Sequence, residues 1–162
     1  MYGRILVPID GSDCANAGLR EIATVASRPA SKVLLLHVIE RYSWDEQFGV
    51  GTVGAIMQGA DRQSGEAILD VARNTLRNFG ILCETILAEA HGQRTSQVIV
   101  AHAQTWKADL IVMGTHGRRG VGQMVMGSDA VEVVRVAATP VLLVSKRGSR
   151  GPSLPDEEQP KE

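Results

Sequence analysis

The sequence contains little cysteine, few aromatic residues and no excess of either charge. Only 2 of the 162 residues are cysteines. Cys14 and Cys83 lie far apart, outside any CxxC pair and away from histidines at metal-ligand spacing, which excludes a disulfide framework and a zinc site. Aromatic residues make up 4%, too few for the stacking platforms of single-stranded nucleic-acid binders. The net charge of −1 provides no overall field toward nucleic acid or an anionic membrane. We therefore expect two reduced, buried thiols and a locally built binding site.

Long hydrophobic runs are also absent. The apolar run at residues 5–9 contains Pro8 and is too short for a signal-peptide core or a membrane span. We therefore expect a cytoplasmic protein that binds neither membrane nor nucleic acid. Glycine, in contrast, is abundant, because the 17 glycines exceed the usual share of about 7%.

Apolar runs typical of strands buried on both faces alternate with helical patterns along the chain. The expected strands cover residues 4–10, 32–39, 81–89, 108–114 and 140–144. The expected helices begin at the capping residue Ser12, at about residue 61, at Gln93 and at Ser128, and the first two end at Pro29 and Gly80. Residues 40–60 look irregular. A domain of residues 1–146 precedes a tail, 147–162, that we expect to be disordered.

The apolar positions of the helices predict which side chains face the core. The stripe of the second helix is expected to include Val71, and that of the last helix Val134. His102 lies on such a stripe, so we interpret it as a hydrogen-bonded packing residue rather than a catalytic base.

Five strands alternating with four helices predict an α/β fold, an open five-stranded parallel sheet with helices on both faces. Right-handed crossovers with a reversal after the third strand predict the order 3-2-1-4-5. The first and fourth strands are then neighbours at the topological switch point. Ligands of such sheets bind beyond the carboxyl ends of the strands at that point. The loops after Asp10 and after Met113 are therefore the candidate site.

The second of these loops is rich in glycine, with the spacing G-x2-G-x9-G-S at Gly114, Gly117, Gly127 and Ser128. Glycines at a strand end let backbone N–H groups approach an anion, and a helix N-terminus favours a phosphate. Two interpretations stay open at this point. The loop binds phosphate, or the glycines only shape it and Ser128 only caps the helix.

This spacing, together with four further phrases, resembles the universal stress proteins over about residues 1–146. The spacing is the pattern of the ATP-binding branch of that family. The phrases are ILVPIDGS at residues 5–12, LHV at 36–38, DLIVMG at 109–114 and TPVLLV at 139–144. The resemblance implies a Rossmann-like fold of the adenine nucleotide alpha hydrolase type, and ATP as the ligand.

The resemblance also implies which residues bind the nucleotide. Those that would hold adenine and ribose are Pro8, Ile9, Asp10 and Val38. Those that would hold ribose and phosphates are Met113, Gly114, Thr115, His116, Gly117, Arg118, Arg119, Gly120, Gly127, Ser128 and Asp129.

The roles of the charged residues in this predicted nucleotide-binding set stay open. Arg118 and Arg119 either neutralise phosphates or remain solvated. Asp10 either accepts from a ribose hydroxyl, contacts phosphate-bound Mg²⁺ or is a solvated carboxylate. Asp129 would repel a phosphate unless Mg²⁺ bridges the two or the side chain points away. No metal site built from protein ligands alone is predicted.

A second glycine motif, GxGxxG at Gly49, Gly51 and Gly54, begins ten residues after Ile39 and not at a strand end. A dinucleotide fingerprint requires a tight strand-to-helix turn. We therefore interpret this segment as a flexible loop.

Our first hypothesis is an ATP-binding, stress-associated regulator in which nucleotide orders the glycine loop and residues 40–60. The resemblance further implies a homodimer that pairs through the edge strand Val141 to Val144. The alternatives are a slow ATP hydrolase or phosphoryl-transfer enzyme using the same pocket, and a nucleotide-free interaction protein. No catalytic residue is predicted, because no nucleophile stands beside a base.

Overall fold

The strands and helices alternate as the sequence predicts. The computed structural model describes residues 2–26, 31–40, 52–115 and 127–145, with the side chains of 52–58 left aside. The strands are β1 (Arg4–Pro8), β2 (Lys32–Ile39), β3 (Cys83–Glu89), β4 (Leu110–Gly114) and β5 (Val141–Val144). The helices are α1 (Asp13–Val25), α3 (Thr52–Asn78), α4 (Thr95–Thr105) and α5 (Ser128–Val136). The expected tail, 147–162, lies outside the described residues.

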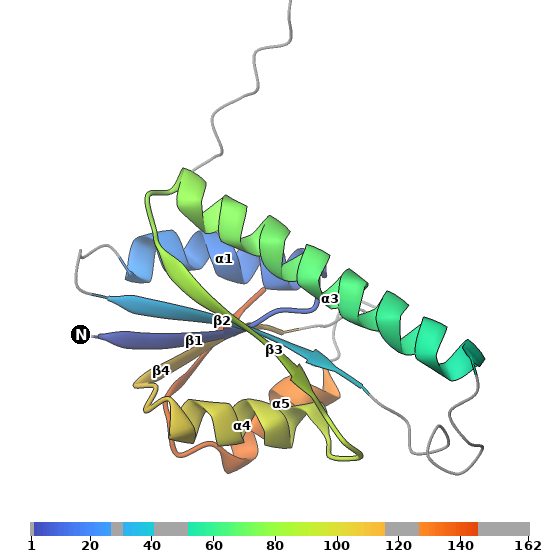
Figure 1. The fold of residues 1–162 in the computed structure, drawn as a ribbon. Coiled ribbons are helices and arrows are strands. Elements are labelled where there is room, and N and C mark those ends of the chain that lie inside the picture. The colour runs from blue at the N-terminus through green and yellow to red at the C-terminus, as the bar shows by residue number, and fades with distance from the viewer. Residues whose placement is uncertain (1, 27–30, 41–51, 116–126, 146–162) are drawn as a thin grey trace, which may run out of the picture.

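All strand pairs are parallel and follow the order β3-β2-β1-β4-β5, which confirms the predicted sheet. Helices α1 and α3 cover one face and α4 and α5 cover the other (Figure 1). Successive strand residues point to opposite faces. In β1, Ile5 and Val7 pack on the α1/α3 face, and Leu6 packs on the α4/α5 face. Burial on both faces explains why the strands are continuous apolar runs.

The ends of two helices show how sequence sets their limits. Ser12 caps α1, because its hydroxyl oxygen accepts a hydrogen bond from the amide of Ala15 at 3.2 Å. After α3, Gly80 adopts φ 74°, and its amide donates to Arg77 while that of Ile81 donates to Leu76. This is a Schellman motif, which favours glycine at that position.

Helix α3 begins at Thr52, so our prediction of irregular chain up to residue 60 was wrong for residues 52–60. The flexible-loop interpretation of the GxGxxG motif was also wrong for Gly54, whereas Gly49 and Gly51 lie outside the described residues. Each glycine lowers helix propensity by about 1 kcal/mol. Extending an existing helix is nevertheless easier than starting one, so the apolar stripe of the later turns supports the earlier ones.

Three predictions about burial were also wrong. Val71 is 62% exposed and Val134 is 45% exposed, because the buried stripes are narrower than expected and centre on Ala72 and Val133. Both cysteines are free but only half-buried. For Cys83, burial raises the pKa of the thiol, and the nearby Arg73 guanidinium partly opposes this rise.

Candidate functional site

The carboxyl ends of β1 and β4 lie side by side at the centre of the sheet. β1 pairs with β2 on one side and with β4 on the other, where Ile5 is opposite Leu110 and Leu6 opposite Ile111. The chain then leaves β1 toward α1 and leaves β4 toward α5, on opposite faces (Figure 1). This divergence is the topological switch point that the sequence predicts.

The turn from β1 to α1 is held by local hydrogen bonds. The half-buried carboxylate of Asp10 accepts from the amide of Ser12 at 3.0 Å. Gly11, between them, has φ 79°, a conformation that favours glycine. The carboxylate of Asp10 is therefore fixed close to the N-terminus of α1, beyond the end of β1.

Ile9 is anchored by a residue that sequence reasoning did not assign to the site. The amide of Ile9 donates to the carbonyl of Leu36 at 2.9 Å, and the Nδ1 of His37 lies 2.7 Å from the carbonyl oxygen of Ile9. A carbonyl only accepts, so Nδ1 carries the proton and donates it. His37 is 7% exposed, and α3 passes close to it at Gly65, where a Cβ would lie 2.9 Å from the ring. A histidine inside an otherwise apolar strand was the available signal.

Further predicted nucleotide-binding residues, on β1, β2 and β4, lie at the same carboxyl edge of the sheet. Pro8 is the last residue of β1 and is half-buried. Val38, next to the last residue of β2, is half-buried and packs on the α4/α5 face. Met113 on β4 is buried on that same face. The structure thus places Val38, predicted to hold adenine and ribose, and Met113, predicted to hold ribose and phosphates, on one face of the sheet.

Gly114 ends β4 where α1 passes very close. A Cβ on Gly114 would lie 2.8 Å from the carbonyl carbon of Cys14 and 2.9 Å from its Cβ. Real Cβ atoms essentially never make such contacts. Glycine at this position therefore has a packing reason that is independent of any phosphate.

The described residues on either side of 116–126 are joined by a backbone hydrogen bond. The amide of Thr115 donates to Val144 at 2.9 Å, and the amide of Gly127 donates to the carbonyl of Thr115 at 2.7 Å. The N-terminus of α5 is thereby attached to the end of β4. The predicted site residues His116, Gly117, Arg118, Arg119 and Gly120 lie outside the described residues.

Gly127 is the N-cap of α5, and Ser128 and Asp129 are its first two residues. The interpretation of Ser128 as no more than a helix cap was therefore wrong. Its side chain is exposed, whereas that of Asp129 is half-buried. A carboxylate in a first helical turn interacts favourably with the helix dipole, which gives Asp129 a role even without a metal.

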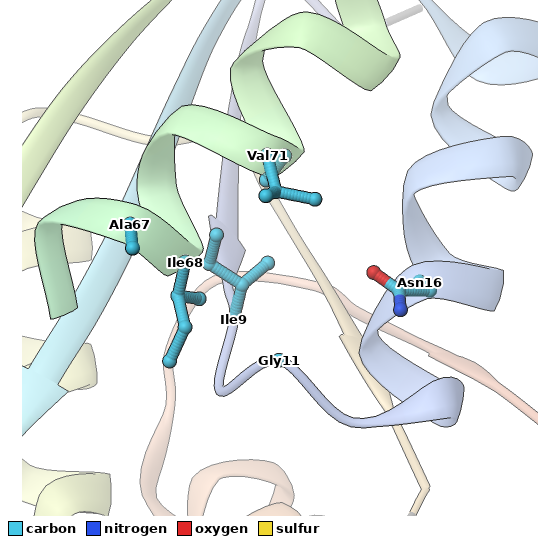
Figure 2. A pocket seen from close by; sticks show the side chains of 7 residues that line it. Ile9, Gly11, Asn16, Ala67, Ile68 and Val71 are labelled. Carbon is cyan, nitrogen blue, oxygen red and sulfur yellow. The ribbon is translucent and has the colours of Figure 1, made fainter. Parts of the chain in front are cut away.

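A cavity of about 250 Å³ opens between α1 and α3, on the opposite face of the sheet from Val38 and Met113. Figure 2 shows Asn16 of α1 on one side of it and Ile68 and Val71 of α3 on the other. Among the predicted nucleotide-binding residues that the structure describes, Ile9 alone lines it. The cavity therefore meets the predicted nucleotide site at Ile9, while Val38 and Met113 lie on the other face of the sheet.

The described residues contain neither a cluster suited to a metal ion nor a membrane-spanning helix. Within residues 2–26, 31–40, 52–115 and 127–145, no three histidine, cysteine, aspartate or glutamate side chains form a group that could hold a metal ion. Over the same ranges, every helix is too short or too polar to cross a membrane.

The order of the strands and the helices on both faces of the sheet define a doubly wound α/β domain. The sequence model of the universal stress protein family matches residues 1–145. The chain therefore belongs to the universal stress protein family.

Known relatives agree with this membership. A universal stress protein of Thermus aquaticus is 32% identical over 149 residues, which cover 89% of this chain and 99% of that protein. The solved structure of protein MJ0577, a universal stress protein of Methanocaldococcus jannaschii, superposes with a TM-score of 0.77 at 25% identity, covering 92% of this chain and 99% of that one. The universal stress protein of Archaeoglobus fulgidus, solved in complex with dAMP, gives a TM-score of 0.62 at 25% identity, covering 88% and 98%.

Proposed function

We propose that this protein binds ATP at the carboxyl edge of the sheet and acts as a nucleotide-dependent regulator of a stress response. The observation that carries the binding proposal is the position of the start of α5 next to the end of β4. The hydrogen bond from Gly127 to Thr115 holds the N-terminus of α5 beside the end of β4, where a phosphate would meet the positive end of the helix dipole. The dAMP complex of the Archaeoglobus fulgidus relative supports an adenine nucleotide as the ligand.

In this proposal the base lies against Val38 and Met113, and the phosphates extend toward α5. Both side chains are on the α4/α5 face, so the nucleotide lies on that face and not in the cavity between α1 and α3. Asp10, held by the amide of Ser12, is positioned to accept from a ribose hydroxyl. The buried His37 acts as a positioning residue, because it fixes the carbonyl of Ile9 at the entrance to the turn.

The first experiment is mass spectrometry of the ligand that copurifies with the protein, followed by calorimetric titration with AMP, ADP and ATP. We expect an adenine nucleotide in the purified protein and binding of all three. If no nucleotide copurifies and none binds, the protein is an interaction module that works without nucleotide. Phosphate release measured in the same preparation distinguishes binding from slow hydrolysis.

A charge placed at the proposed phosphate position tests the site itself. Ser128 is exposed in the first turn of α5, so S128E should fold normally, because a carboxylate is favourable at a helix N-terminus. It should lower ATP affinity more than tenfold through repulsion of the phosphates. The control is S64E, at an exposed position on α3 on the other face of the sheet. Equal ATP affinities of S128E and the wild type would refute this phosphate position.

Magnesium enters the proposal as a bridge between Asp129 and the phosphates. A single carboxylate fits this role, because Mg²⁺ is commonly held by one or two carboxylates together with phosphate oxygens and water. Removing Mg²⁺ should weaken ATP binding in the wild type and have less effect in D129A. If both treatments leave ATP affinity unchanged, Asp129 does not bridge a metal.

We further propose a homodimer that forms through β5. This strand is at one end of the strand order, and α5, which leads into it, exposes Val131, Val134 and Val136. Unpaired strand edges and exposed apolar side chains both favour association. Light scattering should give a dimer for the wild type and for L82E, a control at an exposed apolar position, and a monomer for V134E. A monomeric wild type would remove this proposal.

The expected cytoplasmic location stays a prediction.

A further inference from the structure

The first turn of α4 contains a buried hydroxyl group without a hydrogen-bond partner among the described residues. Ser96 is 1% exposed, and its Oγ has no hydrogen-bond partner within the part of the chain that the structure describes. Buried polar groups are nearly always paired, because an unmade bond loses more free energy than a typical made one gains. An orphaned hydroxyl is therefore a signal that a partner belongs there.

Ser96 lies at the carboxyl edge of the sheet. The hydroxyl of the preceding Thr95 donates to the carboxylate of Glu40, the residue that follows β2, at 3.3 Å. Ser96, Ile99 and Ala103 share one face of α4, since they are three and four residues apart. Ile99 and Ala103 pack against the sheet, and α4 begins at the edge where β3 ends (Figure 1). Ser96 is thus the member of this buried stripe nearest to the strand ends.

The same face carries the apolar side chains of the proposed base site. Ile99, one turn from Ser96, is in the same cluster as Val38 and Met113. A ligand that enters between these side chains meets α4 at its first turn. Because the Ser96 hydroxyl is shielded from water, a ligand atom that bonds to it gains a hydrogen bond instead of exchanging one with solvent.

We propose that the hydroxyl of Ser96 hydrogen-bonds to the polar edge of the purine and so contributes to recognition of the base. This inference rests on the proposed nucleotide site. A serine hydroxyl both donates and accepts, and the edge of adenine carries an amino group beside ring nitrogens that accept. The bond selects a base with a polar edge at this position, and the phosphates contribute nothing to it.

The test compares S96A with the wild type in titrations with adenosine, AMP and ATP. These three ligands share the base and differ in phosphate number. A contact to the base lowers the affinity for each by the same factor, about tenfold, which is about 1.4 kcal/mol. S64A, an exposed serine-to-alanine change on α3, should bind all three as the wild type does.

A second measurement separates recognition from a structural role. Removing an unpaired buried hydroxyl leaves stability unchanged or raises it, so S96A without nucleotide should melt at or above the wild-type temperature. A lower melting temperature would show that Ser96 supports the fold and would overturn the inference.

The possible titration results are distinct. Equal losses for AMP and ATP support a base contact even if adenosine binds too weakly to measure. A loss that grows with phosphate number would show a phosphate contact and overturn the inference. Unchanged binding by S96A would overturn it too, while leaving the proposed function intact. Failure of the wild type to bind any adenine nucleotide would refute the proposed function itself.

Discussion

Replacing Gly114 with alanine tests whether the first glycine of the G-x2-G-x9-G-S spacing serves packing as well as ligand binding. The added Cβ would lie 2.8 Å from the carbonyl carbon of Cys14 and 2.9 Å from its oxygen. Both are backbone atoms of the first turn of α1 and cannot rotate away. Either α1 or β4 must therefore shift.

Overpacking of this kind lowers the free energy of unfolding by about 1–3 kcal/mol. For a domain of this size, the melting temperature should fall by roughly 2–4 °C per kcal/mol. Urea unfolding of the nucleotide-free protein measures the effect, and the m-value should stay constant while the midpoint falls. Working without nucleotide removes any contribution of ligand binding to stability.

The matched control is Gly18, a buried glycine within α1 whose added Cβ would have nothing within 4 Å. G18A should raise the free energy of unfolding by about 0.5–1 kcal/mol, because alanine favours helix and restricts the unfolded chain. If G114A unfolds at the wild-type midpoint, β4 and α1 do not approach as closely as described, and the packing explanation of Gly114 fails.

Three further predictions concern other parts of the fold. Lys107 follows α4 with φ 55°, so K107G should raise the melting temperature by relieving a cost of about 1 kcal/mol; a lower melting temperature would contradict this. The carboxylate of Asp109 accepts from two amides at the start of the chain, at 2.8 and 3.0 Å. D109A should therefore lose about 1–3 kcal/mol in urea unfolding, whereas D70A, which breaks only an exposed ion pair, should change stability by less than about 1 kcal/mol. Burial raises the pKa of the Cys83 thiol above its ordinary value. Folding therefore favours the protonated thiol, and its contribution to stability is present below the pKa of an exposed thiol and is lost as pH rises through the raised pKa. Alkylation should show a titration midpoint above that of an exposed thiol, which R73A shifts higher still, and an unshifted midpoint would refute this.

Much of the fold was predictable because its signals are local and periodic. The alternation of Ile5, Leu6 and Val7 between two covered faces follows from the geometry of a strand. Ser12 at the start of α1 and Gly80 after α3 act on neighbouring amides and carbonyls. The strand order followed from these elements together with the right-handed crossover rule.

The predictions that failed depended on contacts between distant segments. Helix α3 extends back to Thr52 because its later turns pack on the sheet, although the glycines at its start are poor helix formers. Val71 and Val134 are apolar and correctly spaced, but the width of each helix–sheet contact leaves them exposed. A repeat of 3.6 residues indicates a face without indicating how much of it is covered.

For the candidate site, the sequence by itself predicted the place, namely the loops after Asp10 and Met113, and determined the family to which the chain belongs. The tertiary structure decided how the site is supported. The bond from His37 to Ile9, the approach of Cys14 to Gly114 and the isolation of the Ser96 hydroxyl were not readable from spacing. Each depends on where a strand or helix lies relative to an element far away in the chain, and that position is set by packing of the whole core.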